Sequence, residues 1–340
     1  MSDAENRFSP QQYSCTYLIT SGISFVCFLI VLPFSGYNSE VILSCFSYMF
    51  FKFCETFSMY SFSYLQLANK YFKIAVSYCL KGIFPLFVFS LFLYFVHNLW
   101  LSLGVMSLIY LLIIIFFDLK EPKGFFPLGI KIKGTGLILR LCFPMMLSSL
   151  VLPFMFFLTR HTVQSVFDIT ELGYYSAFTM VITVFSTMIG AFYVVLIPKI
   201  SKNYMRKMKA EIVQIIFIML GIIFGASLIA ILLSHLIGNW AFSLIFGISI
   251  LPYMYLLFPV IITSIMLAVM TFLSTCLIAM QKRLFMLISM LAGVLLLCAL
   301  VVPITKSYGM LCTTNILTIS FAFMIIIQSV IILYTFLSEV

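Results

Sequence analysis

The sequence predicts an all-α polytopic membrane protein with about ten transmembrane helices. Hydrophobic residues make up 64% of the 340-residue chain and charged residues only 9%, whereas an ordinary soluble domain carries about 25% charged residues. The apolar segments are long and unbroken rather than alternating, which favours helices over a closed barrel, the other structure that can span a bilayer. At roughly 20 residues a span, the chain holds about ten spans with short loops and no large soluble domain.

The predicted spans fall into two groups, separated by one longer loop. They cover residues 17–35, 41–67, 74–95 and 99–117, then 138–158, 173–196, 212–236, 251–280, 284–303 and 310–336. We therefore expect an N-terminal lobe of four helices in residues 1–120, an inter-lobe loop in 121–137 and a C-terminal lobe of six helices in 138–340. The expected architecture is two lobes, four helices plus six, around a central cavity.

Basic residues accumulate in every second loop, and this fixes the predicted orientation. All but three of the 19 basic residues, the exceptions being Lys52, Arg160 and Lys306, lie at one side of the predicted membrane. Lysine and arginine are retained on the cytoplasmic side, so the inter-lobe loop and both termini are predicted to be cytoplasmic. The net charge of +9 is thus a topology signal. It is divided among short loops without a basic face, and we expect no nucleic-acid partner.

No pattern of catalytic or metal-binding residues stands out. The nine cysteines occur singly in or beside apolar segments, without a CxxC pair, and are interpreted as small buried hydrophobic residues. The sequence contains no Ser-His-Asp set and no histidine at metal-ligand spacing. We therefore expect no catalytic residue, no metal, no cofactor and no enzymatic activity.

A weak internal repeat links the two groups of spans at an offset of 212 residues. Residues 65–77 align with residues 277–289, and both segments combine an apolar helix end, a turn with a lysine (Lys70 and Lys282) and a new apolar helix. Two spans precede the first copy, whereas four precede the second within its group. If the groups are parallel repeats, the first has lost two helices.

Several segments resemble the multidrug/oligosaccharidyl-lipid/polysaccharide exporter superfamily, and specifically its bacterial O-antigen/polysaccharide flippases. The similarity is carried by FPMMLSSL at 143–150, ELGYYSA at 171–177, IPKIS at 197–201 and LIAMQK at 277–282, with a looser match from Tyr64 to Gly82. Family members usually have twelve spans, and this chain resembles one that lacks the first two helices.

The resemblance implies a function and a set of partners. It implies a flippase that moves undecaprenyl-diphosphate-linked oligosaccharide, the O-antigen repeat unit of lipopolysaccharide, across the bacterial inner (cytoplasmic) membrane by alternating access. The implied partners are this substrate, membrane lipids, a coupling ion or proton, and the glycan polymerase machinery. A drug/cation antiporter of the same superfamily, a glycan polymerase and a non-functional truncated member are the alternatives.

Five charged residues in or at the ends of spans are the candidates for the substrate cavity. A charge at the bilayer centre costs about 2.5–3.5 kcal/mol, so it needs a partner or water. Lys52 and Glu55 are three residues apart on one helix face and can pair. Lys81 lies too deep to snorkel easily. Arg160 and Arg140 lie at the outer and inner ends of one span. A structural ion pair, for Lys52 and Glu55, and interface anchoring, for Arg140, are the alternative interpretations.

Overall fold

The computed structural model describes residues 9–35, 38–67, 70–120 and 134–338. Within these ranges the structure contains helices and turns and no β-strand. Ten helices among the described residues are long and apolar enough to cross a membrane, which confirms the predicted all-α fold with about ten transmembrane helices. The chain divides into two compact units, Met1–Leu141 and Cys142–Val340. Most of the predicted inter-lobe loop, residues 121–133, lies outside the described residues.

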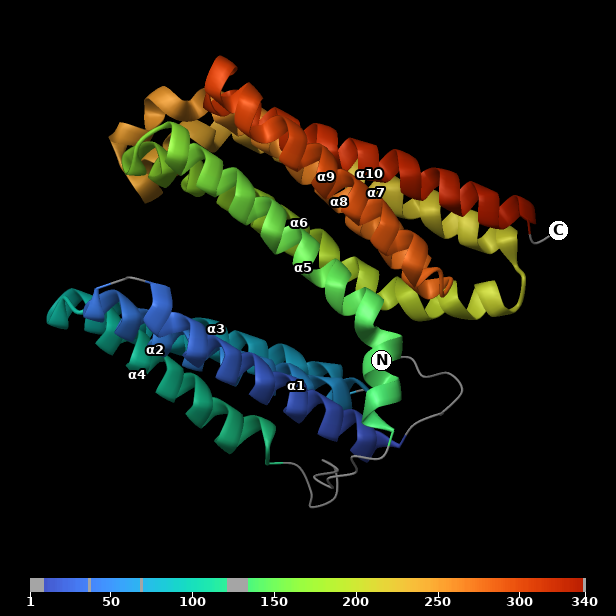
Figure 1. Ribbon diagram of the computed structural model, residues 1–340, viewed down its shortest axis with the longest axis horizontal. Coiled ribbons are helices and arrows are strands. Elements are labelled where there is room, and N and C mark those ends of the chain that lie inside the picture. Colours follow the sequence, from blue (N-terminus) through green and yellow to red (C-terminus); the bar gives the residue numbers. More distant parts are fainter. Residues whose placement is uncertain (1–8, 36–37, 68–69, 121–133, 339–340) are drawn as a thin grey trace. The chain divides into compact units, whose positions relative to one another are not determined.

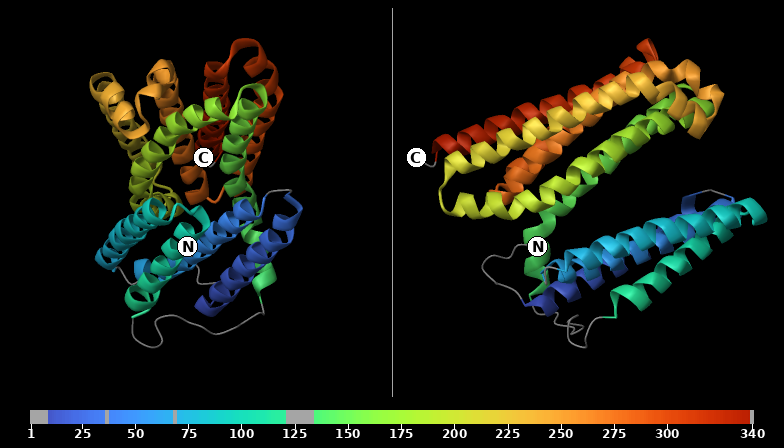
Figure 2. Two further views of the ribbon diagram at one scale, coloured as in Figure 1. Left: turned by 90° about the vertical axis from the view of Figure 1, so that its left-hand side faces the viewer. Right: turned by 180° about the vertical axis from the view of Figure 1, so that it is seen from behind.

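The first unit contains four long helices that run alongside one another (Figures 1 and 2). The helices are α1 (Pro10–Val31) with the 3-10 turn η1 (Leu32–Ser35), α2 (Ser39–Leu67), α3 (Tyr71–Val96), and α4 (Leu99–Ile113) with the π-helical turn η2 (Ile114–Asp118). Tyr17 of α1 stacks on Tyr60 of α2 with 5.1 Å between ring centroids, and the Tyr60 hydroxyl donates to Ser14 Oγ at 2.5 Å. Aromatic rings with one polar end thus join α1 to α2.

The second unit contains six long helices. They are α5 (Thr135–Val166, which begins in the first unit), α6 (Ile169–Met205), α7 (Lys209–Phe246), the 3-10 segment η3 (Ile248–Leu256) leading into α8 (Leu257–Ala279), α9 (Arg283–Tyr308) and α10 (Met310–Ser338). The span that contains α8 has 61% of its most apolar window buried, the largest share of any span. Phe272 of α8 and Phe321 of α10 are fully buried. The core of this unit is therefore built around α8.

Helix ends follow local capping chemistry. Asn98 and Asp168 accept hydrogen bonds from the backbone N–H groups of Leu101 and Ile169 at the starts of α4 and α6, as N-cap side chains do. At the end of α8, Gln281 has a positive φ of 60°, and Lys282 N donates to Leu277 O at 2.9 Å. This is the 6→1 bond of a Schellman turn, which satisfies carbonyls at a helix C-terminus.

The junction between α2 and α3 has a hydrogen bond that matches this one at the offset seen in the sequence. Lys70 N donates to Leu65 O at 2.9 Å, the counterpart of the bond from Lys282 to Leu277. The backbone angles are φ −87°, ψ 51° at Lys70 and φ −89°, ψ 47° at Lys282. Leu65 and Leu277 are both fully buried. The described residues of the two aligned segments therefore share a backbone hydrogen bond, the conformation of the lysine and the burial of the leucine.

The predicted orientation can be tested by cysteine labelling. Single cysteines introduced at Asn38, Asn98, Asp168, Asn239 and Ser307 should react with a membrane-impermeant reagent added outside cells, whereas a cysteine at Lys207 should not. The reason is that basic loops are held in the cytoplasm. External labelling at Lys207 would contradict the proposed topology; labelling of permeabilised cells is the control for a reactive thiol at each site.

Candidate functional site

Lys52 and Glu55 form an ion pair on α2. The Lys52 Nζ lies 2.7 Å from Glu55 Oε2, and the two side chains are 44% and 34% exposed within the described structure. The ammonium also lies over the rings of Tyr48 and Phe51, 5.6 Å and 5.8 Å from their centroids. The i, i+3 spacing predicted this pairing. A half-exposed charged pair in mid-helix needs water or a polar partner inside a membrane.

Lys81 of α3 is buried, and it forms an ion pair with Asp118. The side chains of Lys81 and Asp118 are 2% and 0% exposed. Ser58 Oγ of α2 accepts a hydrogen bond from Lys81 Nζ at 2.5 Å, and Ser77 donates to Asp118 Oδ1 at 2.6 Å. Three helices of the first unit therefore meet at one buried polar cluster, which we call the Lys81–Asp118 cluster (Lys81, Asp118, Ser58 and Ser77).

Two aromatic rings enclose the ammonium of this cluster. Lys81 Nζ lies 4.6 Å from the ring centroid of Phe62 and 5.4 Å from that of Tyr110, distances at which a ring face attracts a cation. Tyr110 lies beside Ser58, and its hydroxyl is close enough to Glu55 and Asp118 to interact electrostatically. Tyr110 thus interacts with one acid of each ion pair, and Ser58 with both Tyr110 and Lys81.

Sequence reasoning missed Asp118, because this residue lies directly after the predicted span 99–117, outside the apolar segment. Asp118 is therefore a second acid, besides Glu55, that pairs with a basic residue of the spans. A signal was present in the sequence. The turn between α3 and α4 lies at His97 and Asn98, so Ser77 and Asp118 are each about 20 residues from it and face each other across an antiparallel pair.

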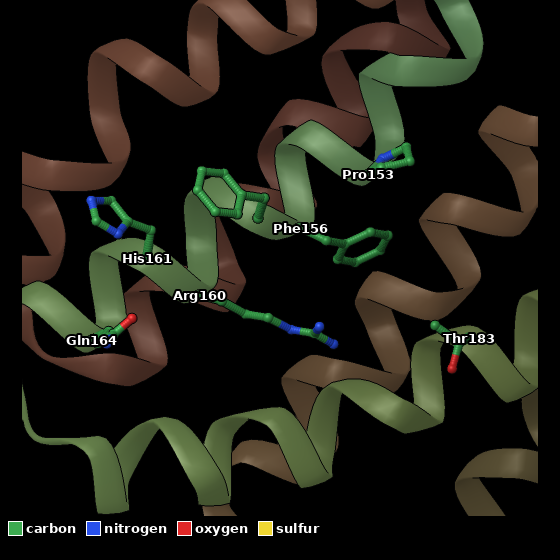
Figure 3. Close-up of a pocket in the computed structure, with 7 residues that line it drawn as sticks. Pro153, Phe156, Arg160, His161, Gln164 and Thr183 are labelled. Carbon is green, nitrogen blue, oxygen red and sulfur yellow. The ribbon is translucent and has the colours of Figure 1, made fainter. Parts of the chain in front are cut away.

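Arg160 lies in the second unit, in a pocket between α5 and α6. The pocket has a volume of about 410 Å³ and is lined by Pro153, Phe156, Phe157, Arg160, His161, Gln164 and Thr183. Figure 3 shows Arg160 reaching from α5 toward Thr183 on α6. Arg160 Nη2 donates to Thr179 Oγ1 at 3.5 Å. Among the described residues, no acidic side chain forms a salt bridge with Arg160.

Helix α5, which lines this pocket, extends beyond the span 138–158 that was predicted from the apolar segment. α5 continues to Val166, so Arg160 lies six residues, about 9 Å, before the helix end and not in the final turn. His161 stacks on Phe157, with ring centroids 5.8 Å apart and an interplanar angle of 5°. The pocket therefore combines one guanidinium with aromatic and amide groups.

The remaining candidate, Arg140, is exposed near the start of α5. It belongs to the first compact unit together with Lys52, Glu55 and Lys81, whereas Arg160 belongs to the second. Within the first unit, Lys52 and Glu55 form an ion pair on α2, and Lys81 donates a hydrogen bond to Ser58 of the same helix. The part of the chain that the structure describes contains no group of three metal-ligating residues.

A second pocket lies in the second unit, between α8 and α10. It has a volume of about 470 Å³ and is lined by Phe258, Pro259, Ile262, Asn315, Thr318 and Ile319. Thr318 shares a hydrogen bond of 2.6 Å with Thr263, and the Asn315 side chain is exposed. None of its lining residues carries a charge, so it lacks the chemistry to hold an ion by direct charge pairing.

Comparison with known proteins identifies a structural neighbour. A solved structure described as a crystal structure of MATE in the bent conformation aligns with a TM-score of 0.69, over 93% of this chain and 75% of that chain, at 13% sequence identity. No family model and no curated protein matches the sequence. At this identity the similarity concerns the fold: the chain is a multi-pass membrane protein with a MATE-like arrangement of helices.

Proposed function

We propose that this protein is a membrane transporter of the multidrug/oligosaccharidyl-lipid/polysaccharide exporter superfamily, and that it is a flippase. The substrate would be undecaprenyl-diphosphate-linked oligosaccharide, the O-antigen repeat unit, moved across the bacterial inner membrane by alternating access. A MATE-like fold supports transport, and the sequence segments at 143–150 and 171–177 support the flippase branch. The further partners in this proposal are membrane lipids, a coupling ion or proton, and the polymerase that receives the substrate.

The environment of Arg160 is the observation that best supports an anionic substrate. Its guanidinium lies in a pocket between α5 and α6, on a helix long and apolar enough to span the membrane, and has no acidic partner among the described residues. An isolated charge within a membrane span is tolerated where water or an opposite charge reaches it. A guanidinium binds phosphate oxygens in a bidentate fork, so a diphosphate fits this position.

The carboxylates of the first unit also favour an anionic substrate over a cationic drug. Glu55, in the middle of α2, and Asp118, which is fully buried at the end of η2, are already paired with Lys52 and Lys81. A drug/cation antiporter needs a carboxylate to receive the cation. This second candidate would require one of the two pairs to open.

The proposal includes a layout and an orientation. In it the N-terminal lobe has four helices, the C-terminal lobe has six, and both termini are cytoplasmic. Lys52, Glu55, Lys81 and Arg140 in the first lobe and Arg160 in the second are the candidate substrate-contacting residues. Of these, Arg160 has the clearest chemistry for a diphosphate.

The substrate class can be tested in proteoliposomes. We expect the purified protein to move a fluorescent polyprenyl-diphosphate oligosaccharide between leaflets and not to accumulate a lipophilic cationic dye. Movement is measured as the change in the fraction of the fluorophore that an impermeant reductant, added outside the liposomes, can bleach. Liposomes without protein are the control for spontaneous flipping. Dye accumulation without movement of the lipid-linked oligosaccharide would favour the antiporter, and movement of neither would support the non-transporting alternative.

A further inference from the structure

The junction between α6 and α7 carries a concentration of positive charge that the proposed transport function does not use. Residues 199–211 contain five basic residues and one acid, Glu211. We propose that this segment binds anionic phospholipids through contacts between its cations and the headgroup phosphates. Four residues form this α6–α7 basic surface: Lys199, Lys202, Arg206 and Lys207. The lipid in this inference is not transported, so the inference does not depend on the proposed flippase activity.

Three of these cations lie on one face of a helix. Lys199, Lys202 and Arg206 follow one another at i, i+3 and i+7 at the end of α6, and positions with this spacing share one side of an α-helix. All three residues are exposed. The helix rises about 10 Å from the first to the third, so the charges form a short row along its surface.

Backbone hydrogen bonds fix the turn that presents Lys207. Lys207 N donates to Tyr204 O at 3.0 Å, and Met208 N donates to Asn203 O at 3.0 Å, which closes the turn after α6. Lys207 is exposed. The fifth basic residue, Lys209, already donates to a backbone carbonyl at the end of α10 at 2.6 Å, so it is not part of the basic surface.

The four cations are available to an external anion. Among the described residues, no acidic side chain forms a salt bridge with any of them. Cations at the end of a helix complement its dipole, and basic residues are retained on the cytoplasmic side of a membrane; these are the alternative explanations for the cluster. Neither alternative predicts that the stability of the protein depends on the charge of the surrounding lipid.

The lengths of the two helices place this surface at the depth of the headgroups. α6 has 37 residues and α7 has 38, which is about 55 Å each, whereas the hydrocarbon core of a bilayer is about 30 Å thick. The turn that joins them lies at the same end of the second unit as the end of α10 (Figure 1). Because this end of α6 carries the charges, it is the end that extends beyond the hydrocarbon.

Exposed methionines accompany the cations. Met205 and Met208 are 61% and 41% exposed. A segment that combines apolar side chains with lysine and arginine suits the boundary between acyl chains and headgroups. A soluble anion such as inorganic phosphate would leave the methionines without a partner, so this combination favours a lipid. The row of cations is also longer than one diphosphate group, and it suits several phospholipid headgroups around the helix end.

Lipid binding can be measured through the thermal unfolding of the purified protein in detergent, because a ligand that binds the folded state raises the unfolding temperature. We expect phosphatidylglycerol, which is anionic, to raise this temperature more than zwitterionic phosphatidylcholine does. Each basic residue near an anionic surface increases affinity roughly fivefold. The Lys202→Gln/Arg206→Gln/Lys207→Gln variant should therefore need about a hundredfold more phosphatidylglycerol for the same rise. A rise equal to that of the wild-type protein at equal lipid would overturn the proposal.

Two control variants separate lipid binding from other effects of charge. Lys202→Arg/Arg206→Lys/Lys207→Arg keeps all three charges and should keep the response to phosphatidylglycerol. Lys306→Gln removes an exposed basic residue in the last turn of α9, at the other end of the second unit, and should also keep it. If the cations only complement the helix dipole, the triple glutamine variant will lose the same stability in both lipids, which would overturn the proposal.

Two measurements on the wild-type protein complete the test without any substitution. Raising the salt concentration screens exposed charges, so it should reduce the response to phosphatidylglycerol; a response that salt does not change would contradict binding through the cations. A response to a polyprenyl diphosphate but not to phosphatidylglycerol would overturn the proposal in favour of a substrate site. None of these readouts involves transport, so a protein that moves no lipid-linked oligosaccharide would contradict the proposed function alone.

Discussion

Replacing Arg160 by alanine is expected to reduce translocation of the lipid-linked oligosaccharide by about tenfold or more, at unchanged protein abundance. A hydrogen bond to a charged group contributes about 1.5–3 kcal/mol, and about 1.4 kcal/mol corresponds to a factor of ten. Arg160 is exposed in its pocket and forms one long hydrogen bond, to Thr179, so its loss should affect the substrate more than the fold. Initial rates in proteoliposomes measure this effect.

Two further variants identify what the guanidinium contributes. Arg160→Lys keeps the charge but loses the planar fork that matches a phosphate group, and we expect a rate between those of the wild-type and alanine variants. Lys306→Ala removes another exposed basic residue of the second unit, in the last turn of α9, and should leave the rate unchanged. Wild-type rates in both Arg160 variants would show that the pocket does not contact the diphosphate.

Hydropathy predicted the number and order of the helices but not their lengths. The predicted span 138–158 became α5 (Thr135–Val166) and the span 173–196 became α6 (Ile169–Met205). Apolar windows end where polar side chains begin, whereas a helix continues until its backbone hydrogen bonds are interrupted. In α5 the helix passes through Arg160, His161 and Gln164 and ends before the N-cap Asp168.

The candidate site was predictable where it depends on local spacing. Lys52 and Glu55 are neighbours on one helix, and the structure pairs them as their spacing indicates. Lys81 and Asp118 are 37 residues apart, and their contact depends on how α3 and α4 pack. The sequence marks Lys81 as a charge deep in its span, whereas Asp118 lies just past the predicted span 99–117, because the π-helical turn η2 carries the helix one residue beyond that span.

Removing one member of the Lys81–Asp118 pair is expected to destabilise the first unit strongly. Lys81→Met would leave the Asp118 carboxylate, which is fully buried, without its counter-charge. Breaking a buried ion pair in this way costs about 3–5 kcal/mol, and we expect the unfolding temperature in detergent to fall by about 10 °C. Asp118→Asn leaves the ammonium its contacts with Ser58, Phe62 and Tyr110, so its effect should be smaller.

The comparison with Lys52 makes this prediction specific. Lys52→Met removes the same charge from a pair whose side chains are 44% and 34% exposed, and exposed pairs contribute about 0–1 kcal/mol. The double variant Lys81→Met/Asp118→Asn removes both buried charges and should recover most of the loss, since the penalty comes from an uncompensated charge and not from the missing attraction. Thermal unfolding of the three variants should therefore rank Lys81→Met as the least stable. Equal stability of Lys81→Met and Lys52→Met would contradict a buried ion pair at Asp118.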